Sequence, residues 1–416
     1  SDRTSPRTPS GMPSRTRMIL MLGALITLGP LTMDMYLPAL PRIADELNVS
    51  SSVAQLTLTG TLVGLALGQL VVGPLSESLG RRRPLMAGIA VHMLASVLCA
   101  VAPDITMLGI ARALQGMGSA SAAVVAVAVV GDLFAGPGAA TVMSRLMLVL
   151  GVAPVLAPSL GAAVLLYGSW RWVFVALVVL GGGLLVLAAA ALPETLPRAQ
   201  RRPLRFRAVG VTYLMLLRDL RFVVLALVAA LGMSGLFAYI SGAAFVLQDG
   251  YGLNQQAFAL VFGAGAIALI GATQFNVVLL RRFDPSTIVV TALAVASVLG
   301  FVFVGLAVTG VGGLAGFVLP VWGVLGAMGF VLPNAPALAL SRHPEASGTA
   351  AALLGCGQFG LGAVISPLVG VLGNSAPAMA AVMTGGVLIA LVALLAAGVR
   401  PGAEHRDTAD MLVEHA

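Results

Sequence analysis

Two charged residues lie inside apolar stretches of this chain, and their chemistry is the most informative feature of the sequence. Asp34 lies in LGPLTMDMYLPALP, within the apolar run 18–40, and it alone of the 16 acidic residues falls in the interior of such a run. Arg112 lies in ARALQGMGSASAA. A charge in membrane hydrocarbon costs roughly 2.5–3.5 kcal/mol, so such a residue faces a polar cavity, is paired or changes its protonation. Because burial disfavours the charged form of a carboxylate, Asp34 predicts a proton carrier.

The two charges are expected at similar depth. Asp34 precedes Pro41 by seven residues and Arg112 follows Asp104 by eight, which places both about 10–12 Å below the same surface at 1.5 Å per residue. We hypothesise that Arg112 holds Asp34 ionised, directly or through water, and is released when Asp34 binds a proton or a substrate binds. The alternative is a static buried ion pair that fixes the packing of two spans.

The elements that position these residues follow from composition. The chain is 59% hydrophobic and 9% charged, with a mean hydropathy of +1.01, far from the values of soluble domains. Its charges fall between apolar runs of roughly 20 residues, the length that a membrane-spanning helix needs. We therefore predict an all-α polytopic membrane protein with twelve transmembrane helices, near 18–40, 52–75, 84–103, 105–131, 140–167, 172–192, 222–247, 255–280, 286–308, 312–340, 346–373 and 376–399. Ten-residue segments of alternating polarity, typical of membrane strands, are absent from the sequence.

The positive charge is unevenly distributed. The net charge is +7, and because there is no lysine all 23 basic residues are arginines. Twenty of them lie on the termini and the loops of one side, whereas Arg42 and Arg171 lie on the other side beside Asp45, Glu46, Asp104 and Asp249. By the positive-inside rule both termini are cytoplasmic. The position of the arginines on one side of the membrane explains the net positive charge, so no nucleic-acid partner is needed to account for it.

The chain divides at its longest internal polar stretch. We expect a disordered N-terminal tail (1–17), an N-terminal six-helix bundle (18–192), a cytoplasmic connector (193–221), a C-terminal six-helix bundle (222–399) and a cytoplasmic tail (400–416). The first apolar run is long enough to span and lacks a small-residue cleavage pattern, so we interpret it as a span and not a signal peptide.

An internal repeat supports two related bundles. GVAPVLAPSLG and GLGAVISPLVG place Gly151, Pro158 and Gly161 at the same spacing as Gly360, Pro367 and Gly370, 209 residues later. Two similar bundles with a site between them form a common transporter plan, in which the cavity opens alternately to each side. Ordinary close packing of glycine-rich helices is the alternative.

Several other classes of protein are excluded by missing residues. The phosphate-binding pattern GxxxxGK[ST] needs a lysine, HExxH is absent, and no Cys/His cluster suggests a metal. We therefore expect no enzyme activity, no cofactor and no metal, and an ion gradient as the energy source for transport. His92 is interpreted as a hydrogen-bonded structural residue, and Cys99 and Cys356 as buried packing residues within spans.

Two long segments resemble a known family. DMYLPALPRIADEL (34–47) and GLFAYISGAAFVLQDGYGLNQQAFALVFG (235–263) are similar to the Bcr/CflA (bicyclomycin/chloramphenicol resistance) branch of the drug:proton antiporters, in the major facilitator superfamily. The similarity covers nearly all of 18–399. It implies a monomeric, multi-pass protein of the bacterial inner membrane that exports small, weakly polar antibiotics in exchange for protons.

The loop between the second and third spans resembles the superfamily pattern G-x-L-x-D-R-x-G-R-R. GPLSESLGRRR agrees at Gly73, Leu75, Gly80, Arg81 and Arg82, whereas Glu77 replaces the aspartate and Ser78 replaces the first arginine. The resemblance implies a cytoplasmic gate in which the acid faces a helix terminus and the arginine reaches an acid at the end of the fourth span, here Asp132. Glu77 can still face a helix N-terminus, where an anion is favoured. Ser78 cannot replace the arginine that reaches Asp132.

Two further motifs match in part. The pattern R-x-x-Q-G of the fourth span appears as Arg112, Gln115 and Gly116, and the resemblance links it to proton coupling. The antiporter motif of the fifth span appears as APSLGA, where Pro158 and Gly161 remain but Ala157 and Ala162 replace glycines. Gly151, Pro158 and Gly161 are thus expected to allow close helix packing.

The substrate cavity is expected between spans 1, 4, 7 and 10, with span 5 beside them. Its candidate residues are polar, aromatic or methionine side chains that adapt to varied ligands: Asp34, Tyr36, Arg112, Gln115, Met143, Met147, Phe237, Tyr239 and Asn334. Core packing is the alternative for each aromatic or methionine, and a helix irregularity is the alternative for Asn334. Proton-coupled uptake of a nutrient or metabolite and a non-transporting membrane sensor are the alternative functions.

Overall fold

The computed structural model describes residues 15–134, 136–201, 206–343 and 346–398. Throughout these residues the regular structure is helical, and no strand occurs in them. Eleven helical segments in this part are long and apolar enough to cross a membrane. The remaining predicted span is occupied by α7 (Gly136–Leu165), whose described apolar part is Val152–Leu165. The predicted all-α membrane fold is confirmed, with a helix at each of the twelve predicted positions.

The first span is broken into pieces. It consists of α1 (Arg15–Ile26), α2 (Leu28–Asp34), the 3-10 turn η1 (Leu37–Ala39) and α3 (Leu40–Glu46). Prolines cause the breaks, because they lack the N–H that a helix needs: Pro30 leaves the Ile26 carbonyl without its usual partner, and Pro38 does the same to Asp34. The sequence suggested one continuous helix over 18–40. Asp34 instead is the last residue of a helical segment, and the 3-10 turn η1 follows three residues later.

Small residues bring the other helices of the N-terminal half close together. A Cβ at Gly64 would lie 1.9 Å from the Ala113 carbonyl oxygen, and one at Gly116 would lie 2.1 Å from that of Thr61. These glycines therefore let the second and fourth spans touch backbone to backbone. The helices of this half are α4 (Ser51–Leu79), α5 (Arg82–Ala100), α6 (Ile105–Leu133), α7 and α8 (Arg171–Ala191).

The C-terminal half repeats the broken first span. Its first span consists of α10 (Leu220–Gly232), α11 (Ser234–Phe245) and the π-turn η3 (Val246–Gly250), and it breaks at Met233 as the N-terminal one breaks at Thr27. Before it come the short turn η2 (Arg198–Gln200) and α9 (Phe206–Arg218). After it come α12 (Gln255–Leu279), α13 (Pro285–Thr309), α14 (Gly313–Leu340), α15 (Ser347–Val371) and α16 (Ala376–Ala396).

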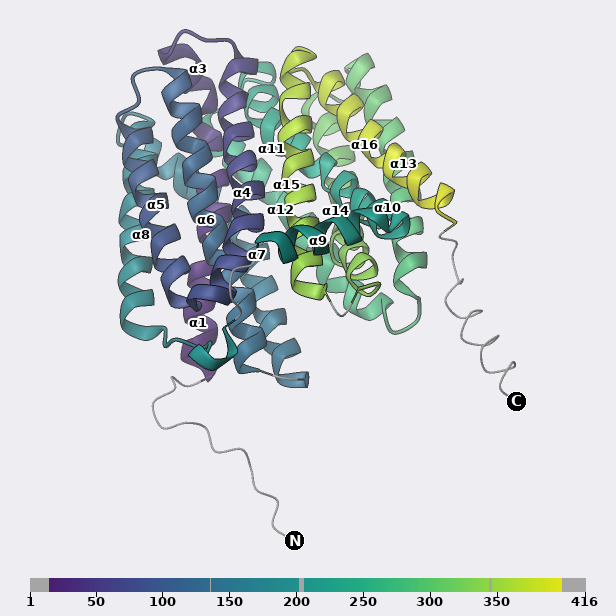
Figure 1. Ribbon diagram of the computed structural model, residues 1–416. Helices are drawn as coiled ribbons and strands as arrows, with labels where there is room; N and C mark the ends of the chain where they lie inside the picture. Colours follow the sequence, from purple (N-terminus) through teal and green to yellow (C-terminus); the bar gives the residue numbers. More distant parts are fainter. Residues whose placement is uncertain (1–14, 135, 202–205, 344–345, 399–416) are drawn as a thin grey trace, which may run out of the picture.

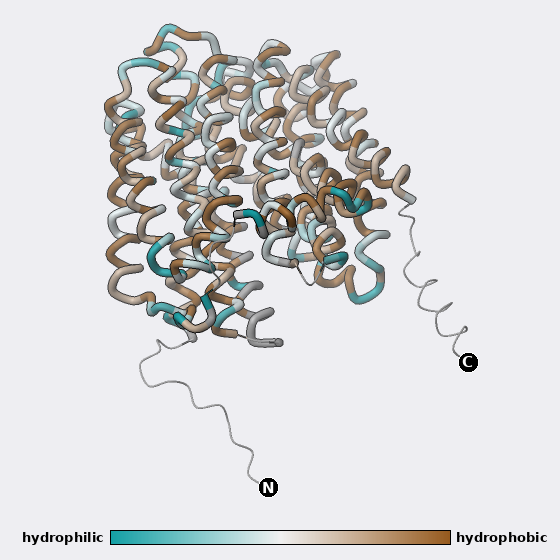
Figure 2. The backbone as a smooth tube through the Cα atoms, viewed as in Figure 1, coloured by the Kyte–Doolittle hydropathy of each residue, from teal (hydrophilic) through white to brown (hydrophobic). Residues whose placement is uncertain are grey.

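The long helices stand roughly side by side in two groups (Figure 1). Figure 2 shows apolar residues along their lengths and polar residues concentrated near their ends. We call the end that carries Arg42 and Arg171, at the top of Figure 1, the outer end, and the opposite end the inner end. The two halves meet where α4 packs on α15, where α7 packs on α12, and where η1 and α3 pack on α11.

The buried core is shared at one end and divided at the other. One apolar cluster at the outer end joins both halves and includes Tyr36 and Leu40 together with Phe237 and Phe245. Towards the inner end, the described residues form two separate clusters, one within each half. The halves are therefore packed together most continuously at the outer end.

Candidate functional site

Arg112 is buried within the N-terminal half and has no acidic partner among the described residues. Its guanidinium lies over the Tyr36 ring at 4.4 Å and near the Phe174 ring at 5.9 Å. Nη1 donates to the Thr32 carbonyl at 2.9 Å and to Gln115 Oε1 at 2.5 Å. Nε and Nη2 are buried without a hydrogen-bond partner in the described structure. The cation is held by π-electrons and neutral oxygens, and it keeps two donors free for a further group.

A chain of hydrogen bonds continues from Arg112 into the third span. Gln115 Nε2 donates to Ser96 Oγ at 2.7 Å, and Ser96 Oγ donates to the His92 carbonyl at 2.7 Å. The Thr32 hydroxyl donates to the Leu28 carbonyl at 2.6 Å and lies 2.8 Å from His92 Nε2. Since that hydroxyl proton is already used, Nε2 is the donor to Thr32. His92 thus helps to fix the α2 backbone that Arg112 binds.

Asp34 is buried at 4% exposure but is not brought to Arg112. No ion pair or hydrogen bond joins the two side chains in the described structure. By helical periodicity Asp34 lies on the face of α2 opposite Thr32, the face it shares with Leu31, and α2 packs on α7. The hypothesis of a direct Asp34–Arg112 pair is therefore not met in this arrangement.

The predicted cavity residues separate into different environments. Tyr36 is fully buried beside Arg112, and its hydroxyl lies 2.8 Å from Thr57 Oγ1. In the other half, Phe237 faces Phe359 with ring centroids 6.2 Å apart, and Tyr239 stacks on Phe262 at 4.9 Å.

Asn334 is occupied by hydrogen bonds within the C-terminal half. Its Nδ2 donates to Asn276 Oδ1 at 2.7 Å and to the Phe330 carbonyl at 2.8 Å. The first of these bonds ties α14 to α12, and α14 runs as one helix from Gly313 to Leu340 through Asn334, so no interruption of the helix marks this position. The side chains of Met143 and Met147 lie outside the described residues.

The inner-end motif forms a compact network. Arg81 binds Asp132 through Nε at 2.8 Å and Nη2 at 3.0 Å, and its Nη1 donates to Ser76 Oγ at 2.9 Å. Its backbone N–H donates to Glu194 Oε1 at 2.8 Å. Gly80 has φ +89°, and a Cβ there would lie 2.3 Å from the Glu194 carboxylate. Arg81 thus takes the acid-binding role that Ser78 cannot fill.

The remaining gate residues have simpler surroundings. Arg82 is half-buried, and its side chain donates to the Ala189 carbonyl. A Cβ at Gly348, the second residue of α15, would lie 3.7 Å from Glu77 Oε1, so this carboxylate approaches a helix N-terminus in the other half, where an anion is favoured. No side chain crowds Gly73: a Cβ there would meet nothing within 4 Å.

The span 5 motif packs against the broken first span. A Cβ at Gly161 would lie 2.1 Å from the Met35 carbonyl oxygen, and Pro158 is buried one turn earlier. The glycine therefore lets α7 reach the turn that follows Asp34. Gly151 lies within α7, but its surroundings are outside what the structure describes.

A polar cluster at the outer end was missed by sequence reasoning. Gln55 Nε2 donates to the Ser241 carbonyl at 2.8 Å and to Asn374 Oδ1 at 2.5 Å, and Asn374 Nδ2 donates to Ser51 Oγ at 2.5 Å. We call Ser51, Gln55, Ser241 and Asn374 the outer clasp, since they join the two halves. A glutamine inside an apolar span was the available signal, but its partners are 186 and 319 residues away.

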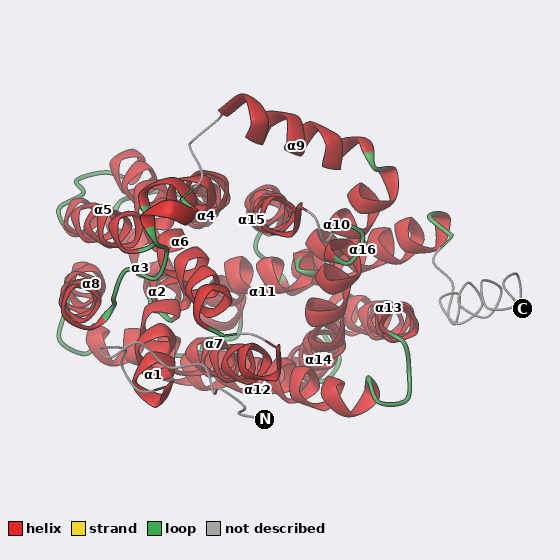
Figure 3. Ribbon diagram, turned by 60° about the horizontal axis from the view of Figure 1, so that its bottom comes forward, coloured by secondary structure: helices red, strands yellow, loops and turns green. Residues whose placement is uncertain are grey.

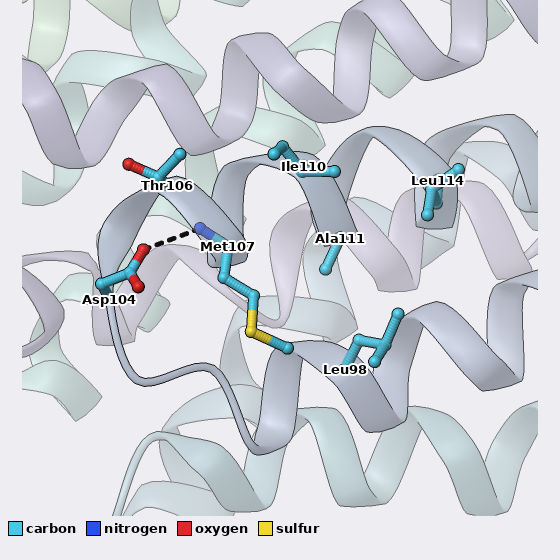
Figure 4. Close-up of a pocket in the computed structure, with 7 residues that line it drawn as sticks. All are labelled: Leu98, Asp104, Thr106, Met107, Ile110, Ala111 and Leu114. Atoms are coloured by element: carbon cyan, nitrogen blue, oxygen red, sulfur yellow. Dashed lines mark hydrogen bonds between the residues drawn. The ribbon is translucent and has the colours of Figure 1, made fainter.

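Figure 4 shows a surface pocket at the outer end of α6. It is lined by Leu98, Asp104, Thr106, Met107, Ile110, Ala111 and Leu114. Asp104 caps α6 by accepting from the Met107 N–H at 2.9 Å. Ile110 and Leu114 are exposed and lie on the opposite face of α6 from Arg112, so this pocket is separate from the polar network.

Comparison with known families decides the classification. The family model of the Major Facilitator Superfamily matches residues 20–367. The chain belongs to the major facilitator superfamily. It is therefore a multi-pass membrane transporter, and the two broken first spans, α1–α2 and α10–α11, belong to that transporter's two halves.

Relatives of this superfamily member include proteins named for drug resistance. It is 38% identical over 381 residues to the uncharacterized MFS-type transporter YdgK of Bacillus subtilis, covering 90% of this chain and 93% of that protein. It is 30% identical over 351 residues to the bicyclomycin resistance protein homolog of Haemophilus influenzae, covering 84% and 88%. It is also 34% identical over 264 residues to a chloramphenicol resistance protein of Pseudomonas aeruginosa, covering 62% and 60%.

Solved transporters share the superfamily fold. The xylose transporter XylE of E. coli, in a partially occluded inward-open conformation, matches with a TM-score of 0.73 at 13% identity, covering 93% of this chain and 98% of that one. A D-xylose-proton symporter matches with a TM-score of 0.68 at 17% identity, covering 91% and 96%. At these identities the likeness extends to the fold alone.

Proposed function

We propose that this protein is a proton-coupled antiporter of the Bcr/CflA branch that exports small, weakly polar antibiotics of the chloramphenicol or bicyclomycin type. The observation that carries the proposal is Asp34, a carboxylate buried at the break of the first span with no cation bound to it among the described residues. The names of the relatives support the substrate class. The Asp34 to Leu47 and Gly235 to Gly263 segments support the branch.

The proposed coupling uses the break as a moving part. An unpaired buried carboxylate is costly as an ion, so we assign Asp34 its neutral, proton-bound form in this outer-closed arrangement. Loss of the proton would require a new partner, and Arg112 Nε and Nη2, on the adjacent helix α6, are buried donors with free capacity. Rotation of the short α2 segment, which is freed from α3 by Pro38, would bring the carboxylate towards them. Substrate binding in the cavity would compete with that pair.

The proposed orientation follows the arginines. The inner end, with twenty of the 23 arginines on its loops and termini, faces the cytoplasm, and the protein lies in the bacterial inner membrane with both termini cytoplasmic. We keep the division into bundles 18–192 and 222–399 joined by 193–221, and a monomer as the working unit. The shared outer core and divided inner cores then correspond to a transporter closed towards the outside.

Transport by purified protein tests the proposal. In proteoliposomes with an imposed pH gradient, we expect chloramphenicol or bicyclomycin to move against the direction of proton movement, and addition of drug to release protons from protein in detergent. Drug movement in the same direction as protons would instead indicate the uptake alternative. Absence of any flux with a panel of drugs, from protein that remains folded, would favour a non-transporting sensor.

A further inference from the structure

The connector helix α9 lies outside the bundle, alongside the seam between the two halves. Figure 1 shows it crossing the front of the molecule at a steep angle to the spans, and Figure 3 shows it at the edge of the helix assembly beside α15 and α10. It packs on these two helices. Leu216 anchors it, fully buried in the inner cluster of the C-terminal half. The opposite face of α9 is left uncovered.

The uncovered face combines apolar and basic residues in a regular stripe. Arg207, Val211, Leu214 and Arg218 recur at intervals of four, three and four, so they share one face of a helix. Val211 is 61% and Leu214 50% exposed. Met215 and Leu217 flank them at 44% and 54% exposure. Four large apolar side chains would face water if this surface had no further contact, which is costly.

The two arginines that bracket this stripe have no acidic partner in the described structure. Elsewhere on the connector side, Arg201 binds Glu194, and Arg342 and His343 bind Asp219. Although partial burial acts to raise it, hydrogen bonds from Arg342 and His343 hold the pKa of Asp219 at about 2. Arg207 and Arg218 are exposed and take part in no such pair. They lie eleven residues apart, about 16 Å along a helix.

We propose that α9 is a membrane-surface anchor that binds anionic phospholipids, with Arg207 and Arg218 on the headgroup phosphates and Val211, Leu214, Met215 and Leu217 among the upper acyl chains. An amphipathic helix with a basic edge and bulky apolar residues is suited to this position. Guanidinium groups match phosphate geometry, and each basic residue near an anionic surface adds to binding. The inference rests on the proposed cytoplasmic position of the inner end.

Membrane lipid fits this surface better than a soluble protein does. The apolar stripe continues onto the lateral surface of the spans through Leu220, 74% exposed, and Leu227, 41% exposed, on α10. Both residues belong to a candidate membrane span. A surface that merges with lipid-facing helices is covered by the same lipid layer. Anchoring α9 there would hold the connector beside α15, at the joint between the moving halves.

A fluorophore on α9 provides a local test. We would attach an environment-sensitive nitrobenzoxadiazole probe at Leu214→Cys, in a chain with Cys99→Ala and Cys356→Ala, and reconstitute it into phosphatidylcholine vesicles. Part of the lipid would be brominated phosphatidylglycerol in one series and brominated phosphatidylcholine in the other. We expect quenching, with a preference for the anionic lipid that falls about fivefold for each arginine lost in Arg207→Gln and Arg218→Gln.

The matched control is the pair Arg281→Gln and Arg282→Gln, two exposed arginines at the end of α12, which should leave the preference at α9 unchanged. An unquenched probe, equal quenching by both lipids, or an equal loss in the control would each overturn the proposal. The proposal would also be overturned if the probe at position 214 were shielded from water only after a soluble protein is added. Because the readout needs no transport, it distinguishes failure of this proposal from failure of the antiport proposal.

Discussion

At the scale of single residues, the protein separates two charges that the sequence suggested as a pair. Asp34 and Arg112 lie on neighbouring elements, yet Asp34 is on the face of α2 that is turned from Arg112. The Arg112 guanidinium instead packs on the Tyr36 ring and donates a hydrogen bond to Gln115. The two residue types therefore have distinct tasks in this arrangement. The carboxylate can exchange a proton, while the cation organises the polar core of its half.

Asp34→Asn tests the first task. The amide has the same shape but cannot exchange a proton, so we expect pH-driven drug transport to fall to the level of protein-free vesicles while the folded fraction is unchanged. The measurement is drug flux in proteoliposomes with an imposed pH gradient. The control is Asp104→Asn, since asparagine also caps a helix, and this variant should transport normally. Full pH-driven flux in Asp34→Asn would refute the proton-carrier role.

A double-mutant cycle tests the separation of the two charges. Because no contact joins them here, the destabilisations of Asp34→Asn and Arg112→Ala should add, with an interaction energy below about 0.5 kcal/mol. Arg112→Ala alone should cost about 1–3 kcal/mol, because the Gln115 and Thr32 oxygens lose their donor. Thermal unfolding of the four proteins in detergent at neutral pH provides the measurement. An interaction energy above about 1 kcal/mol would show that the charges are paired in the resting protein.

At the scale of helices, the network of Arg81 replaces a missing motif residue. The sequence located the loop and Asp132, but it could not show that Arg81 would turn back to Asp132, because that depends on the positive φ of Gly80 and on Glu194, 113 residues away. Breaking a largely buried ion pair leaves an uncompensated charge. We expect Arg81→Ala to destabilise the protein by about 2–4 kcal/mol.

Arg82→Ala is the matched control for this change. Arg82 is half-buried, and in the described structure its side chain bonds only a backbone carbonyl, so its loss should cost about 0.5 kcal/mol or less. Unfolding temperatures in detergent give the comparison. Equal losses of stability in the two variants would show that the Arg81–Asp132 contact is not a stabilising link.

The outer clasp allows the same reasoning for the contact between the halves. Gln55→Ala removes two hydrogen bonds that cross from α4 to the other half. At about 1 kcal/mol each, their loss should shift the balance towards outer-open forms by roughly 30-fold. Spin labels at the exposed residues Asn48 and Gln256, on the two halves at the outer end, would measure the separation. We expect a longer-distance population in Gln55→Ala, whereas Leu67→Ala, at a 49% exposed position on the same helix, should keep the original distribution.

The sequence predicted the spans more completely than the site, and the reason is physical. Span positions depend on local hydrophobicity, so runs such as 255–280 and 312–340 correspond closely to α12 and α14. The hydrogen-bond partners of a side chain, in contrast, depend on which helix faces pack together. Asn334 was expected in the cavity because of its type, but its bonds to Asn276 arise from the packing of two helices 58 residues apart. The break beside Asp34 was readable in principle, from Pro30, Pro38 and Pro41.

At the scale of the whole molecule, the shared outer core and the two inner cores predict an asymmetry in water access. Where the halves pack into one cluster, we expect reagents not to pass between them. Where each half has its own cluster, we expect water to reach the helices that face each other. Alternating access requires this asymmetry to reverse. The resting protein should therefore be accessible from the inner end only.

Cysteine labelling tests the asymmetry. Ala123 is partly exposed and lies eleven residues, three turns, beyond Arg112 on the same face of α6, so it belongs to the inner part of that face. Ala238 of α11 is fully buried in the shared outer cluster.

With Cys99→Ala and Cys356→Ala, we expect Ala123→Cys to react with a membrane-impermeant maleimide at least 10-fold faster than Ala238→Cys when the inner end is exposed, as in inverted vesicles. In right-side-out vesicles neither should react quickly until the outer clasp is removed by Gln55→Ala, which should raise the rate at Ala238. Faster labelling of Ala238 than of Ala123 in the unmodified background would mean that the resting transporter opens outward, and that the joined outer core is not its stable state.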